Sequence, residues 1–134
     1  MSTASASASA PDRDEIVRVV QLYVDGFQGD IAKFREAFHQ DAWIFFTQPN
    51  GDLYKRLISE CFEEWVADPE PIVGRILSVT QAGDIASVLL GFDSPKGPSD
   101  SWVDFHTLLR INGTWKITNK TATHNSRAAW AGSH

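Results

Sequence analysis

Two ionisable side chains, Asp104 and His106, stand two residues apart in the alternating stretch SWVDFHTLLRI. Residues two apart on a strand share a face, and their Cα atoms lie about 6–7 Å apart. In apolar surroundings a carboxylate stabilises an imidazolium, so the pair could act as a general acid or base. The alternative is structural, with Asp104 anchoring a neighbouring element and His106 satisfied in the interior. The spacing therefore predicts a candidate acid–base pair.

An Asn-Gly dipeptide at 112–113 separates this stretch from a second alternating run. Asn-Gly between two such runs indicates a two-residue hairpin turn, because both residues tolerate a positive φ. Counting outward from the turn, the predicted register sets His106 opposite Asn119. Two residues further from the turn, Asp104 faces Thr121, and directly opposed residues share a face. Asn119 and Thr121 are therefore predicted to orient a polar group of a substrate, or else to hydrogen-bond across the strands.

Aromatic residues elsewhere in the chain could complete such a site. Tyr23 lies on the apolar face of a predicted first helix, and we predict it as a third catalytic residue whose hydroxyl polarises an oxygen. Its alternative role is core packing with the hydroxyl at the rim. Trp43, Phe45 and Trp102 are predicted to pack a substrate, unless they belong to the core or to the outer face of a sheet.

The rest of the chain predicts the elements that hold these residues. Apolar residues at helical spacing indicate two early helices, which Gly29 separates, and a third helix from Leu53 to Trp65. A strand at 41–48 precedes the third helix, and four strands joined as a meander follow Pro71. Early helices and late strands favour an α+β fold. We expect a cone-shaped, curved antiparallel sheet wrapped around the three helices.

Length and composition predict one domain at 12–124, between a disordered tail at 1–11 and a C-terminal tail at 125–134. The chain has 134 residues, of which 43% are hydrophobic and 22% charged, as in an ordinary globular protein. Its first residues, MSTASASASA, lack the basic start and apolar centre of a secretory signal. The cytoplasm is therefore the expected compartment.

Charge and cysteine content argue against several classes of function. With 12 basic and 17 acidic residues, the net charge of −5 disfavours nucleic acid or an anionic membrane as a partner. No apolar run reaches the roughly 20 residues of a membrane helix. The single Cys61 excludes a disulfide framework and a multi-thiolate zinc site, and the histidines lack metal-ligand spacing. We therefore expect neither a metal nor a cofactor.

The second face of the predicted hairpin has the mixed character of a subunit interface. It carries the apolar Phe105, Leu109 and Ile111 together with Lys116 and Lys120. A sheet with apolar residues on both faces needs cover on both sides. We therefore expect a homodimer formed through the outer face of the sheet.

Several short segments, taken in their order and spacing, resemble one family of folds. They are Gly29-Asp30, Phe38-His39-Gln40-Asp41-Ala42, Asn50-Gly51, Val103-Asp104-Phe105, Asn112-Gly113-Thr114-Trp115-Lys116-Ile117 and Asn119-Lys120. The sequence from Asp12 to about His124 resembles the nuclear-transport-factor-2-like (NTF2-like) superfamily, which has the cystatin-like cone fold. The likeness is greatest to its SnoaL-like branch and to small proteins named "putative lumazine-binding".

The resemblance implies a small-molecule pocket but leaves two functions open. The superfamily includes ketosteroid isomerases, whose oxyanion-donor tyrosine falls near Tyr23 and whose second aspartic acid corresponds loosely to Asp104. Their general-base aspartate falls near Phe46, which cannot take a proton. One expectation is a cofactor-free isomerase, cyclase or dehydratase acting on a small apolar organic substrate. The alternative, which Phe46 favours, is a non-catalytic ligand-binding or dimerisation module.

Overall fold

The computed structural model describes residues 10–125, so most of the two predicted tails lies outside the described residues. The helices are α1 (Ala10–Gly26), α2 (Ile31–Ala37) and α3 (Phe62–Ala67), with short 3-10 turns η1 (Ile58–Cys61) and η2 (Pro98–Asp100). The strands are β1 (Phe38–Thr47), β2 (Leu53–Leu57), β3 (Val73–Ala82), β4 (Ile85–Asp93), β5 (Trp102–Ile111) and β6 (Thr114–His124).

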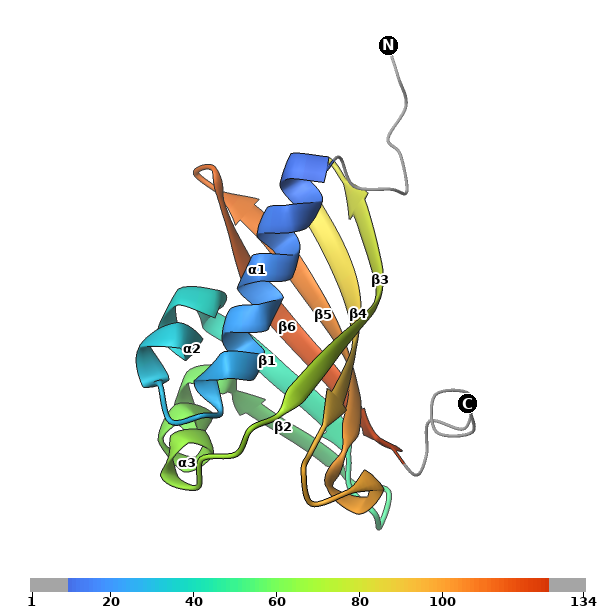
Figure 1. Cartoon of the computed structure of the whole chain (residues 1–134). Helices are drawn as coiled ribbons and strands as arrows, with labels where there is room; N and C mark the ends of the chain where they lie inside the picture. The colour runs from blue at the N-terminus through green and yellow to red at the C-terminus, as the bar shows by residue number, and fades with distance from the viewer. Residues whose placement is uncertain (1–9, 126–134) are drawn as a thin grey trace.

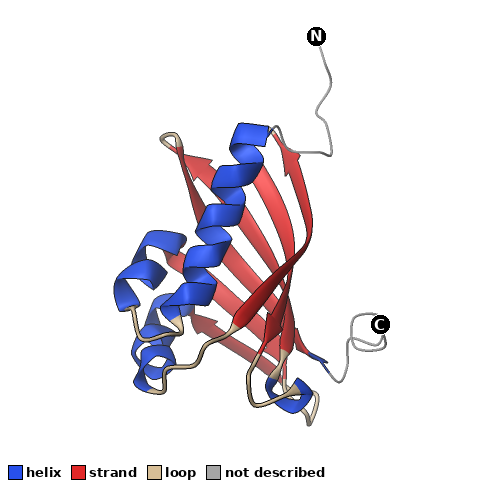
Figure 2. Cartoon of the chain, viewed as in Figure 1, coloured by secondary structure: helices blue, strands red, loops and turns tan. Residues whose placement is uncertain are grey.

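The strands form one curved sheet that does not close, in the order β2-β1-β6-β5-β4-β3. Neighbouring strands are antiparallel except β1 and β6, which run parallel. Helix α1 runs along the concave face, and α2 and α3 lie toward the β1–β2 end of the sheet (Figure 1; Figure 2). The predicted α+β cone is therefore confirmed, but the predicted wholly antiparallel sheet is wrong, because the parallel β1–β6 pair makes the sheet mixed.

The predicted third helix is wrong in its first part, where the chain forms β2 instead. This strand pairs with β1 in antiparallel register, so the sheet has six strands where five were predicted. Leu53 and Leu57 are four residues apart, a spacing that places them on one face of a helix and equally of a strand. The ring of Tyr54 stacks on Phe46 of β1 with centroids 4.2 Å apart, which adds a side-chain contact to the pairing of the two strands.

The Asn-Gly turn forms as predicted, but the register beyond it changes at a β-bulge. Near the turn, Leu108 pairs with Ile117 as predicted, whereas the next residue on β5, Thr107, pairs with Asn119. Thr118 is therefore the extra residue on β6, and its hydroxyl donates to the backbone oxygen of Thr107 at 3.2 Å. A one-residue shift moves every later side chain to the other face of the strand.

The predicted cross-strand pairs of the two acid–base residues are consequently wrong. His106 lies opposite Lys120, and Asp104 lies opposite Ala122. Asn119 and Thr121 turn to the outer face of the sheet. One end of the cone is filled by buried apolar side chains of α1 and the hairpin, among them Ile16, Val20, Leu108, Trp115 and Ile117.

Candidate functional site

A cavity of about 250 Å³ lies inside the cone, toward the end that the apolar core does not fill. Most of its lining residues are aromatic: Tyr23, Phe27, Ile44, Phe46, Tyr54, Cys61, Trp65, Phe92, Trp102, Lys120 and Ala122. Phe46, Tyr54 and Trp102 are half-buried, whereas Tyr23 is fully buried. The cavity therefore runs from a rim of partly exposed rings to a buried base.

The three predicted catalytic residues meet at this base. The Tyr23 hydroxyl, on α1, donates to Oδ2 of Asp104 on β5 at 3.2 Å. Nε2 of His106 lies 3.4 Å from the same oxygen, and the His106 ring lies 4.8 Å from the Tyr23 ring. Asp104 and His106 are fully buried behind Tyr23, and only Tyr23 of the three lines the cavity.

The structure adds a residue to this group that sequence reasoning placed on the outer face, Lys120. The bulge turns it inward, where its residue exposure is 8%. Its Nζ lies 5.4 Å from the centre of the Tyr23 ring and 5.1 Å from that of Trp65. Among the described residues, no hydrogen-bond acceptor meets this ammonium. Because no glycine or proline marks the bulge, the sequence offers no signal for the inward position of Lys120.

The charge states at the base of the cavity follow from burial and from Lys120. Burial alone would raise the pKa of Asp104, but the Lys120 ammonium, His106 and the Tyr23 hydroxyl outweigh it, so the pKa lies below its ordinary value. Burial lowers the pKa of His106 despite the adjacent carboxylate. Burial and the Asp104 charge raise the pKa of Tyr23 well above its ordinary value. Near neutral pH the group therefore holds a carboxylate, a neutral imidazole and a protonated phenol.

Buried atoms in this group lack hydrogen-bond partners within the described part of the chain. They are Oδ1 of Asp104 and both ring nitrogens of His106, since the geometry of the Nε2–Oδ2 approach is not that of a hydrogen bond. Buried polar atoms without partners are uncommon in folded proteins. Their concentration beside a cavity marks this base as the polar end of a candidate site.

The predicted substrate-binding residues divide between the two faces of the sheet. Trp102 lines the cavity. On β1, alternation turns Ile44 and Phe46 inward, so Trp43 and Phe45 lie on the outer face, in register with Asn119 and Thr121 of β6. The Nζ of Lys55 lies 5.0 Å from the exposed Trp43 ring. The structure therefore does not bring Trp43, Phe45, Asn119 or Thr121 to the cavity.

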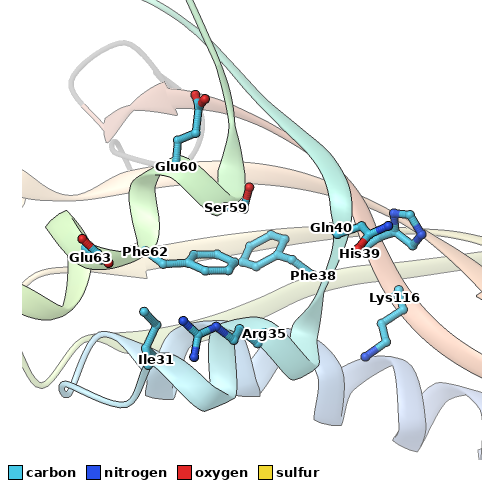
Figure 3. A pocket seen from close by; sticks show the side chains of 10 residues that line it. All are labelled: Ile31, Arg35, Phe38, His39, Gln40, Ser59, Glu60, Phe62, Glu63 and Lys116. Carbon is cyan, nitrogen blue, oxygen red and sulfur yellow. The ribbon is translucent and has the colours of Figure 1, made fainter.

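A larger cleft, of about 740 Å³, lies outside the cone between α2, the start of β1 and the η1–α3 segment (Figure 3). The rings of Phe38 and Phe62 lie side by side at its centre, 5.9 Å apart. Arg35, Glu60 and Glu63 line it, but all three are exposed, so water satisfies their charges. The smaller cavity is the better candidate because it adjoins buried polar groups that water does not reach.

The described residues offer neither a metal site nor an activated cysteine nucleophile. Between residues 10 and 125, no three His, Cys, Asp or Glu side chains gather closely enough to hold a metal ion. Burial raises the pKa of the Cys61 thiol, which makes it a poor nucleophile. None of the described helices is both long and apolar enough to span a membrane.

Comparison with known proteins identifies the fold family. A protein of unknown function from Shewanella baltica, described as NTF2-like, superposes with a TM-score of 0.78 at 25% identity, over 87% of this chain and 96% of that one. An NTF2-like protein from Methylobacillus flagellatus gives 0.76 at 24% identity, over 89% and 96%. A protein from Shewanella frigidimarina described as a putative ketosteroid isomerase gives 0.58 at 19%, over 81% and 94%.

Sequence comparison supplies the family itself. No curated protein matches the chain. The sequence profile of a family described as "Putative lumazine-binding" matches residues 11–122, which is most of the chain. The chain therefore belongs to this family, within the NTF2-like superfamily.

Proposed function

We propose that this protein binds a small, largely aromatic organic molecule inside the cone, with one oxygen of the ligand accepting a hydrogen bond from Lys120. The cavity volume of about 250 Å³ lies just below the range for ligand sites, which begins at about 300 Å³. Such a volume suits a molecule built on one ring or a small fused ring system. The aromatic lining offers faces on which a planar ring packs.

The observation that carries the proposal is the ammonium of Lys120. It is held over two aromatic rings and faces the cavity, and it donates no hydrogen bond to any described residue. Cation–π contacts stabilise the charge but leave N–H groups without acceptors. A ligand oxygen in the cavity would supply the missing acceptor, and a hydrogen bond from a charged donor is stronger than one between neutral groups.

The family description names lumazine, which makes it an obvious compound to test. Lumazine carries several ring nitrogens and two carbonyl groups around its edges. Apart from Tyr23, whose hydroxyl is directed to Asp104, the described residues of the cavity wall carry five polar groups: the Lys120 ammonium, the Tyr54 hydroxyl, the Cys61 thiol and the indole N–H groups of Trp65 and Trp102. Polar edges that meet aromatic rings lose their hydrogen bonds to water without replacement. We therefore expect an apolar ring with one polar substituent to bind more tightly than lumazine.

Catalysis is the second candidate function, and the neutral imidazole of His106 beside an ionised carboxylate favours it. In this alternative, His106 moves a proton in a cofactor-free isomerisation, cyclisation or dehydration. Against it, none of the described residues on the cavity wall carries a carboxylate, and Phe46 lies on that wall where the resemblance to isomerases would require the base. Loss of turnover in His106→Asn, with ligand affinity retained, is the result that would support catalysis.

A calorimetric titration of aromatic carbonyl and carboxylate compounds tests the binding proposal. Lys120→Met should lower the affinity at least tenfold, the effect of losing about 1.4 kcal/mol from a charged hydrogen bond. Lys55→Met is a matched control, because Lys55 also lies over a tryptophan ring but on the outer face. Ala122→Phe should block binding by filling the cavity. Equal affinity in the wild type and in Lys120→Met would refute the role of Lys120.

A further inference from the structure

The buried charges at the base of the cavity are balanced in the empty protein. Lys120 contributes one positive charge, Asp104 one negative charge, and His106 is neutral. An anionic ligand on Lys120 would add a negative charge close to the fully buried Asp104 carboxylate. An excess charge in a site shielded from water is costly unless another group compensates it.

His106 is the group placed to compensate. Its Nε2 already lies 3.4 Å from Oδ2 of Asp104, and its Nδ1 has no partner among the described residues. Tyr23 faces it from α1, Lys120 lies opposite on β6, and β4 places the apolar Val88 opposite on its other side. Among these groups, the imidazole is the side chain whose ordinary titration lies closest to neutral pH.

We propose that the ligand is an organic anion, with a carboxylate or phenolate oxygen on the Lys120 ammonium, and that it binds together with one proton that His106 accepts. The inference rests on the proposed function of the cavity. Protonated His106 becomes the counter-charge of Asp104, which leaves the charge of Lys120 for the ligand. The sum over Lys120, Asp104, His106 and the ligand is then zero, as it is in the empty protein.

The lowered pKa of His106 is consistent with proton uptake on ligand binding. Burial keeps the pKa of His106 below its ordinary value, so the imidazole carries no proton near neutral pH before the ligand arrives. An anion nearby favours the protonated imidazole and raises that pKa. Affinity for an anion should then rise as the pH falls, by a factor that approaches tenfold per pH unit for uptake of one proton.

Cinnamate and cinnamamide provide the test, because they share a shape and differ in charge. Calorimetry of the full-length wild type in buffers of different ionisation enthalpy measures the protons taken up with each compound. We expect cinnamate to bind with uptake that approaches one proton as the pH falls toward about 6, and cinnamamide with none. His106→Asn should abolish both the proton uptake and the pH dependence of cinnamate binding.

Each outcome separates this inference from the proposal on which it rests. Cinnamate binding with the same heat in every buffer, and the same affinity at every pH, would refute proton uptake and leave ligand binding intact. Tighter binding of cinnamamide than of cinnamate at every pH would refute the proposal that the ligand is an anion. If neither compound binds, the proposed function fails for this class of ligand, and proton uptake fails with it. The buffer comparison uses the wild type, so it does not depend on the folding of His106→Asn.

Discussion

The buried hydrogen bond between Tyr23 and Asp104 should contribute measurably to the stability of the fold. Tyr23→Phe removes a single hydroxyl that donates to Oδ2 of Asp104 at 3.2 Å, while the ring and its packing remain. Hydrogen bonds to a charged group contribute about 1.5–3 kcal/mol, and here the acceptor is fully buried and has a second oxygen without a partner. We therefore expect Tyr23→Phe to lower the free energy of unfolding by about 1.5–3 kcal/mol.

Urea denaturation near neutral pH measures this loss, and Tyr54→Phe is the matched control. The Tyr54 hydroxyl accepts a hydrogen bond from the Arg56 guanidinium at 3.0 Å in a half-exposed position, so its removal should cost little. Equal effects of the two substitutions, or a loss below about 0.5 kcal/mol for Tyr23→Phe, would refute the buried network.

The stability difference between the wild type and Tyr23→Phe should also depend on pH. The folded protein holds the pKa of Asp104 below its ordinary 3.8, so this carboxylate stabilises the fold above that value and ceases to do so as the pH falls through the folded pKa. Removing the hydroxyl raises the folded pKa toward the unfolded one. The difference in stability between wild type and Tyr23→Phe should therefore shrink at acid pH.

Two further predictions concern His106 and the outer face of the sheet. Because the folded protein holds the pKa of His106 below its ordinary 6.5, the unfolded chain binds a proton on this residue at a higher pH than the folded protein does. The free energy of unfolding should therefore fall as the pH drops below about 6.5, by up to about 1.4 kcal/mol per pH unit. Denaturation of His106→Asn at several pH values should lack this slope, and an unchanged slope would contradict the prediction. The second expectation is a homodimer through the outer sheet face, where Phe105 is 55% exposed and Leu109 38%. Phe105→Glu should halve the mass measured by sedimentation, whereas Ala32→Glu at an exposed position of α2, away from the sheet, should not. A monomeric wild type would refute the dimer.

The polar base of the cavity could be predicted from the sequence because its signals are local. The Asn-Gly turn and strict alternation put Asp104 and His106 on the face that becomes concave, and helical spacing put Tyr23 on the face of α1 that meets it. These signals depend on a few neighbouring residues. The positions of these three residues can therefore be predicted without knowing how the other strands pair.

The remaining residues of the site could not be predicted, because distant contacts decide them. The bulge at Thr118 forms in a strand that also pairs in parallel with β1, and no glycine or proline in the sequence indicates its position. Its consequence is that Lys120 replaces Asn119 at the cavity. Leu53 to Leu57 fits a helix or a strand equally well by spacing alone, and pairing with β1 selects the strand.

A crystal structure of the protein grown with cinnamate would show where the ligand binds. We expect electron density for the compound among the aromatic rings of the cone, with a carboxylate oxygen within hydrogen-bond distance of Nζ of Lys120. Density for cinnamate in the outer cleft between Phe38 and Phe62, with the cone empty, would contradict this expectation.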